Sequence, residues 1–132
     1  MTNEIRAIVE EIYESDFLHV VKFDFNGVKL SMMSLELPNI KKDDEVLLSV
    51  KPTHISLSKL YPSKTTISNI LLSEVADVQN GDILSMVLLK TGESVLESIV
   101  TLEASKKLGI EKGDKMYALI KSSEIFIKEV LR

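Results

Sequence analysis

The chain has 132 residues, enough for one ordinary domain or two very small ones. Acidic residues outnumber basic ones by 20 to 16, giving a formal net charge of −4, and this balance argues against nucleic acid and anionic membranes as partners, since both favour a basic surface. Apolar residues make up 45% of the chain but aromatic residues only 5%, so we expect an aliphatic core. The chain contains no cysteine, which excludes disulfides and thiolate metal sites.

The N-terminal stretch MTNEIRAIVEEIYE is charged and lacks the apolar segment of a signal peptide. No run reaches the roughly 18 apolar residues that a membrane-spanning helix requires. We therefore expect a cytoplasmic protein without a membrane partner.

The first copy of a weak internal repeat begins at the N-terminus. Its expected strands are bounded by a tight Asn26-Gly27 turn, a Pro-terminated stretch at 34–38 and an Asp43-Asp44 turn. They cover residues 5–13, 17–25, 28–32, 46–51 and 55–58.

The second copy follows the linker KLYPSKTT, and its expected strands cover residues 70–78, 83–90, 94–100, 116–121 and 125–130. Thr101 has the properties of an N-cap for a helix through Leu108, with Gly109 just beyond the helix end.

Matching positions support a duplication. Asn3 matches Asn69 at an offset of 66 residues (69 − 3), and Lys51 matches Lys121 at an offset of 70 (121 − 51). An insertion in the second copy accounts for the difference. We expect the first, degenerate domain at residues 1–60, the second at 64–132, and the strand 125–130 to complete the second set.

Five short strands with a short helix or turn before the fourth is the order of an OB-type barrel. The predicted fold class is therefore all-β, with tandem OB-fold-like five-stranded barrels. Both faces of the segments 46–50 and 116–120 are apolar, so one face can fill a barrel while the other packs against a second barrel or subunit. We accordingly expect a homo-oligomer.

The two lysine corners are the strongest candidates for binding chemistry. Lys121 leaves an apolar strand and is followed by Ser122 and Ser123, and Lys51 is followed by Pro52 and Thr53. Ammonium groups, hydroxyls and turn N–H groups together can bind a small anion. The alternative is a pair of solvated strand ends.

Two further stretches could donate to an anion. Residues 65–69, TTISN, gather hydroxyls and an amide, and Thr101 begins a helix. Ordinary turn and cap roles remain the alternatives for both. His19 and His54 have no spaced partner, which favours surface or interface roles, and a position near a site is the alternative for His54, which follows Thr53. No catalytic motif is present, so we expect no enzymatic activity.

The second copy resembles the Mop family of molybdate-binding OB domains, which is related to the TOBE domains of transport ATPases. TISNIL resembles the opening S-A-R-N-x-L of that family, and VTLEASKKLGIEKGDKMYALIKSSEIFI resembles its closing block; together these cover residues 63–130. The first copy resembles the same domain more loosely, through NEIRAIV and LLSVKPTHISLS.

The resemblance implies that molybdate or tungstate is held as a bound oxyanion between domains of an oligomer, a dimer or trimer, with no metal atom coordinated directly by a side chain. Carried over residue by residue, the implied oxyanion-binding positions are Thr66, Ile67 (through its backbone N–H), Ser68, Asn69, Thr101, Lys121, Ser122 and Ser123, with Asn3, Lys51 and Thr53 in the first copy.

This sequence departs from the family pattern at two of these places. Ser68 stands where the family often has arginine, which removes a bidentate cationic donor. Pro52 removes one backbone N–H from the first copy.

Three functions follow as hypotheses. The first is a molybdate- or tungstate-binding protein for molybdenum storage or homeostasis. The second is a free-standing TOBE-type regulatory module that docks on a transporter ATPase or a transcription regulator. The third, single-stranded nucleic-acid binding, requires aromatic platforms and positive charge, and it ranks last because the chain has few aromatic residues and an acidic balance.

Overall fold

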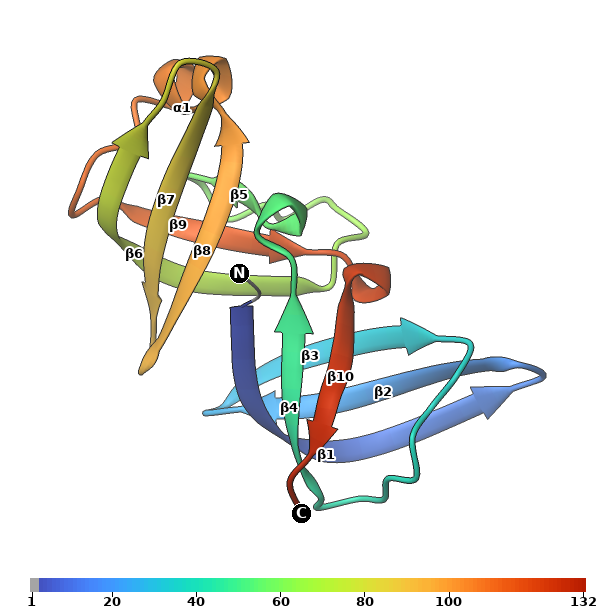
Figure 1. Ribbon diagram of the computed structural model, residues 1–132. Coiled ribbons are helices and arrows are strands. Elements are labelled where there is room, and N and C mark those ends of the chain that lie inside the picture. Colours follow the sequence, from blue (N-terminus) through green and yellow to red (C-terminus); the bar gives the residue numbers. More distant parts are fainter. Residues whose placement is uncertain (1–2) are drawn as a thin grey trace.

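The computed structural model describes residues 3–132 and consists of two five-stranded antiparallel sheets, each curled into a small OB-like barrel (Figure 1). The predicted all-β fold class is confirmed. The first sheet contains β1 (Asn3–Ser15), β2 (Leu18–Phe25), β3 (Val28–Ser34), β4 (Glu45–Val50) and β10 (Ile125–Val130). The second contains β5 (Ser56–Ser58), β6 (Asn69–Asn80), β7 (Leu84–Thr91), β8 (Ser94–Thr101) and β9 (Lys115–Ile120).

Three short helical segments join these strands: α1 (Leu102–Leu108) and the 3-10 turns η1 (Pro52–His54) and η2 (Ser122–Glu124). Helix α1 has the predicted caps, because the Thr101 hydroxyl accepts from the Ala104 N–H and Gly109 adopts a left-handed conformation at φ 62°. The first barrel has turns in place of this helix before β4, and no helix within residues 3–132 is long and apolar enough to cross a membrane.

The two halves of the chain exchange their last strands. Strand β10 lies beside β4 in the first barrel, with Phe126 opposite Ser49, and β5 lies beside β9 in the second, with Ser56 opposite Leu119 (Figure 1). The expectation that residues 125–130 complete the second set of strands is therefore wrong.

The local backbone is the same at both crossings. Lys51 and Ile55 are both extended, at φ −71° and −102°, on either side of the single turn η1. Lys121 and Ile125 flank η2 in the same way. After each turn the chain continues into the other barrel, where β5 pairs with β9 and β10 pairs with β4.

The turn before the fourth strand is the same in both barrels, as the matching positions predict. Asp44 accepts a hydrogen bond from the Lys41 N–H at 3.0 Å, and Asp114 accepts one from the Glu111 N–H at 2.8 Å. The pairing of each first strand with its second shifts register by one residue, after Val9 in β1 and at the corresponding place in β6.

The buried side chains are mainly aliphatic, as expected, with two phenylalanines, Phe23 and Phe25, in the first barrel. Two asparagines, one from each barrel, form hydrogen bonds to the backbone of the other barrel, and we call each of them a staple. The Asn69 amide bonds the Ser31 N–H at 2.6 Å and the Ser31 carbonyl at 2.9 Å, and Asn3 does the same with Glu97, both at 2.8 Å. Each side chain thus extends the hydrogen bonding of one barrel to a strand of the other.

Candidate functional site

A small pocket of about 180 Å³ lies at the junction of the two halves. Its lining combines two apolar side chains, one hydroxyl and three ionisable groups. These residues are His54, Ser56, Ile67, Leu119, Lys121 and Glu124.

Strand exchange builds this pocket. Ser56 belongs to the first half of the chain, yet it lies opposite Leu119 because β5 pairs with β9. Lys121 follows β9 directly, and Ile67 stands two residues before Asn69, which pairs with Ile120. The pocket would not exist if each half kept its own fifth strand.

A histidine from the first half and a glutamate from the second half meet at the pocket. His54 Nδ1 lies 2.8 Å from a carboxylate oxygen of Glu124, and the two side chains are 37% and 36% exposed. His54 ends η1 and Glu124 ends η2, so the pair joins corresponding positions of the repeat. The Lys51 corner therefore carries a histidine where the Lys121 corner carries a glutamate, so the two corners differ in the charge of their side chains.

Two of the predicted oxyanion-binding residues, Ile67 and Lys121, line this pocket. Lys121 is exposed and offers its ammonium group at the end of β9. The Ile67 N–H, the predicted donor of that residue, donates instead to the Thr65 hydroxyl at 3.1 Å in this structure. That hydroxyl would have to release the N–H before Ile67 could donate to a ligand.

The remaining hydroxyl residues lie beside the pocket without lining it. Thr66 and Ser68 are exposed in the segment before β6. Ser122 and Ser123 form the start of η2, where no side chain caps the turn. Thr66, Ser68 and Ser123 are exposed and Ser122 is half-buried, and all four lie near Lys121 or Ile67 along the chain.

The first-copy corner is arranged in the same way but does not contribute to this pocket. Lys51 precedes η1 and Thr53 lies within it, both exposed, and neither lines the pocket. The position that corresponds to Ile67 falls at residue 1, outside the described residues 3–132.

Three predicted positions have other contacts. Asn3 and Asn69 use their amides to staple the two barrels together, and Asn69 is fully buried. Thr101 caps helix α1 and pairs with Leu84 at the far end of β8, and it does not line the pocket with Lys121. These three side chains are not brought to the lysine corner.

Sequence reasoning missed Ser56, Leu119 and Glu124 as pocket residues, and it gave His54 a place near a site only as the alternative to a surface or interface role. A signal was available for His54 and Glu124, because they occupy matching positions of the repeat, next to lysine corners already singled out. Ser56 could not be found, since only the exchange of β5 brings it there.

A larger hollow of about 820 Å³ on the first barrel is less suited to an anion, because its carboxylates outnumber its two lysines, Lys41 and Lys42. The four carboxylates are Glu10, Glu11, Asp24 and Asp43. Lys29 stands beside this hollow, and its bond to Glu10 at 2.8 Å raises the lysine pKa above its ordinary value. That ammonium is thus already engaged by carboxylates.

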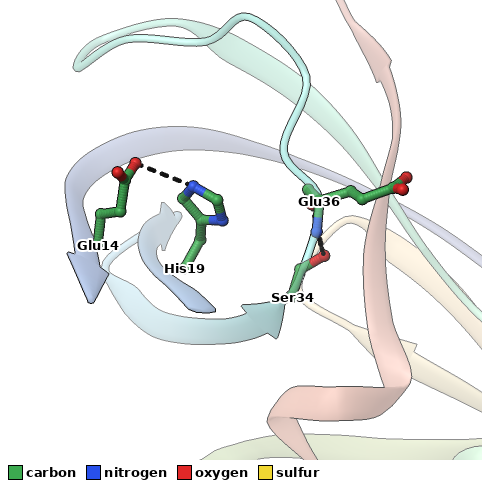
Figure 2. Close-up of polar contacts among 4 residues, drawn as sticks. All are labelled: Glu14, His19, Ser34 and Glu36. Atoms are coloured by element: carbon green, nitrogen blue, oxygen red, sulfur yellow. Dashed lines mark hydrogen bonds and ion pairs between the residues drawn. The ribbon is translucent and has the colours of Figure 1, made fainter. Parts of the chain in front are cut away.

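The other histidine lies away from the pocket. Figure 2 shows the His19 ring beside Glu14 on the neighbouring strand, with Nε2 3.0 Å from the Glu14 carboxylate, while the Glu36 side chain points away from the ring. Nδ1 of His19 is buried without a hydrogen-bond partner in the described part of the chain. The two histidines therefore make similar ion pairs in different places, and only His54 lines the pocket.

Known proteins similar to this chain include a domain family and several curated relatives. The TOBE domain family matches residues 65–127. A probable molybdenum-pterin-binding protein of Haemophilus influenzae is 34% identical over 65 residues, which span 48% of this chain and 94% of that protein. The molybdate/tungstate import ATP-binding protein WtpC of Pyrococcus abyssi is 31% identical over 118 residues, or 89% of this chain. The chain spans 25–32% of the length of the import ATP-binding proteins that it matches.

A solved structure of the cytoplasmic molybdate-binding protein ModG, with molybdate bound, superposes with a TM-score of 0.89 at 25% identity. The alignment covers 95% of this chain and 94% of that one. The fold and the pocket between exchanged strands thus define a tandem OB-barrel protein. The relative from Haemophilus influenzae is matched along almost its whole length. Together with the TOBE match, this shows that the chain belongs to the Mop/TOBE family.

Proposed function

We propose that this protein binds molybdate or tungstate in the pocket between its exchanged strands, and that it serves molybdenum storage or homeostasis without catalysis. The observation that carries the proposal is the placement of Lys121 and Ile67, both implied by the family resemblance, in one pocket. The relatives named for molybdate and tungstate support the choice of ligand.

The chemistry of the pocket suits a small dianion. A tetrahedral oxyanion loses hydration on binding and must regain it from fixed donors. Lys121 supplies charge, and Ser56, Ser122 and Ser123 are hydroxyl donors in or beside the pocket. Most of these donors are neutral hydroxyls, so the bound oxyanion can also be released, as a storage protein requires.

Calorimetric titration with sodium molybdate tests this proposal. We expect saturable binding with a dissociation constant of about 1 μM or lower, or roughly −8 kcal/mol. Sulfate serves as the control oxyanion. Absence of both heat and thermal stabilisation with molybdate and with tungstate would refute the proposal.

The alternative is a free-standing regulatory module that docks on a transporter ATPase or a transcription regulator. It is favoured by the import ATP-binding proteins, in which the matched segment is about a third of a longer chain. A pull-down on immobilised protein, with and without molybdate, separates the two functions: capture of an import ATPase by the ligand-free protein would favour docking.

We also propose that the protein is a homo-oligomer, a dimer or a trimer, in the cytoplasm. Large apolar side chains are exposed on both barrels, among them Phe17 at 84% and Ile83 at 76%, and such surfaces are commonly covered by a partner. Native mass spectrometry gives the number of subunits and of bound oxyanions together, and a ligand-free or ligand-bound monomer at working concentration would contradict this expectation.

A further inference from the structure

We propose that one pair of matched positions decides which of the two lysine corners accepts an oxyanion. Ser56 keeps the Lys121 corner open and polar, and Phe126 closes the Lys51 corner. The inference rests on the proposed function and deepens it, because it names the two side chains that limit each chain to a single oxyanion at these corners.

At the Lys121 corner, the pairing of β5 with β9 brings a hydroxyl to the pocket. Ser56 lies opposite Leu119, and Lys121 follows Leu119 two residues later. Residues that lie opposite each other in an antiparallel pair project on the same face, as do residues two apart along a strand. All three residues accordingly line one pocket. A serine is small and carries a donor, so it gives an anion both room and a hydrogen bond.

At the Lys51 corner, the pairing of β10 with β4 repeats this arrangement with different side chains. Phe126 lies opposite Ser49, and Lys51 follows Ser49 two residues later. Each position stands 70 residues from its counterpart at the other corner (126 − 56, 119 − 49 and 121 − 51). The backbone is extended at Lys51 and at Lys121, with φ of −71° and −64°. The two corners therefore differ in their side chains rather than in their backbone.

The serine of the Lys51 corner is covered. Ser49 is 1% exposed, and its hydroxyl has no hydrogen-bond partner in the described part of the chain. Buried hydroxyls normally have such a partner. The side chain opposite Ser49 on β10 is the apolar ring of Phe126, which fills the position that the Ser56 hydroxyl occupies at the other corner. A donor is thus present at the Lys51 corner, but the ring keeps an oxyanion away from it.

The surroundings of Phe126 are also unsuited to an anion. The ring lines a hollow of about 410 Å³ whose wall includes Met32, Leu37 and Ile127. Among the described residues, no lysine, arginine or histidine lines this hollow, and its one ionisable side chain is Glu36. Phe126 is 45% exposed and lies outside the buried core, so its replacement changes the corner without emptying the barrel.

Calorimetric titration with sodium molybdate counts the oxyanions that each chain binds. The wild-type chain should bind one, in the pocket with Lys121. Phe126→Ser uncovers the Lys51 corner and should bind two, and the added oxyanion should be lost again when Lys51→Ala is combined with it. Val95→Ser also removes an exposed apolar side chain, but it lies on β8 and lines neither hollow, so it should still bind one.

The reciprocal variant closes the corner that is open in the wild-type chain. Ser56→Phe places a ring opposite Leu119 and should weaken molybdate binding by about tenfold or more. The double variant of Ser56→Phe with Phe126→Ser exchanges the two side chains. It should bind one oxyanion, whose affinity depends on Lys51 and no longer on Lys121. A general loss of structure would not transfer the dependence from one lysine to the other.

Three outcomes would overturn this inference and leave the proposed function standing. They are a wild-type chain that binds two oxyanions and loses one of them in Lys51→Ala, a Phe126→Ser variant that still binds one, and a double variant whose binding still depends on Lys121. A wild-type chain that binds neither molybdate nor tungstate would overturn the proposed function and the inference together.

Discussion

Single polar residues hold the two barrels in place, and Asn69 is the clearest case. Its amide pairs with both backbone groups of Ser31 and is fully buried. Asn69→Ala leaves a buried N–H and a buried carbonyl without partners, so we expect the free energy of unfolding to fall by about 2–4 kcal/mol.

Urea denaturation measures this loss, with the exposed neighbour Ser68→Ala as the control, which should change stability by less than about 0.5 kcal/mol. Equal stabilities of the two variants would show that the staple is unimportant. The sequence could indicate that Asn3 and Asn69 are equivalent, but each amide bonds a strand of the other barrel, and the sequence does not place those strands beside it. The family resemblance implied instead that both asparagines are ligand donors.

Backbone conformation at the turn before the fourth strand gives a second prediction. Gly113 has φ +94°, and Asp43, its counterpart, has φ 75°. Gly113→Ala places a Cβ in a left-handed conformation and should lower the free energy of unfolding by about 1–2 kcal/mol. No neighbour lies within 4 Å of that Cβ, so the loss is backbone strain alone.

The matched variant Asp43→Gly relieves the same conformation in the first barrel and should leave stability unchanged or raise it. Thermal unfolding of both variants compares the two turns directly. Stabilisation by Gly113→Ala would contradict the assignment of this turn.

At the level of elements, most strands could be predicted from the sequence and their pairing could not. Alternating apolar residues and turn signals located the strands and helix α1. The exchange of β5 and β10 was missed because the two halves repeat each other, so β5 and β10 suit either barrel by pattern. The pairing of β5 with β9 and of β10 with β4 is visible only in the structure.

The exchange predicts the behaviour of an isolated half. In residues 64–132, β10 loses its partner β4, and β9 loses its partner β5. Each copy of the fragment can supply what the other lacks, since β10 corresponds to β5, and we expect a homodimer in which β10 of each copy pairs with β9 of the other.

Light scattering on the purified fragment should therefore give about twice the fragment mass. The full-length chain, in which both pairings are internal, is the reference for stability. A folded monomeric fragment with β10 protected from hydrogen exchange would show that η2 can reverse the chain, contrary to the geometry seen here.

For the whole molecule, the central point is that one pocket is assembled from both halves. Lys121 lines it and Lys51 does not, although the two lysines match in the repeat. Lys121→Ala should weaken molybdate binding by about 1.5–3 kcal/mol, the contribution of a hydrogen bond from a charged donor. Lys51→Ala, the matched control, should leave the affinity of this pocket unchanged.

Calorimetry on both variants distinguishes the two corners. A larger loss from Lys51→Ala than from Lys121→Ala would place the binding site at the first-copy corner. The sequence could single out both lysine corners as candidates, but it could not show which of them lines this pocket, because that depends on the side chains that strand exchange brings to each.

The most direct test is the anomalous diffraction of tungsten from crystals grown with tungstate. The expected result is a tungsten peak in the pocket, with the oxyanion within hydrogen-bond distance of Lys121 and beside the His54–Glu124 pair. A tungsten peak elsewhere on the protein, with the pocket empty, would contradict this account.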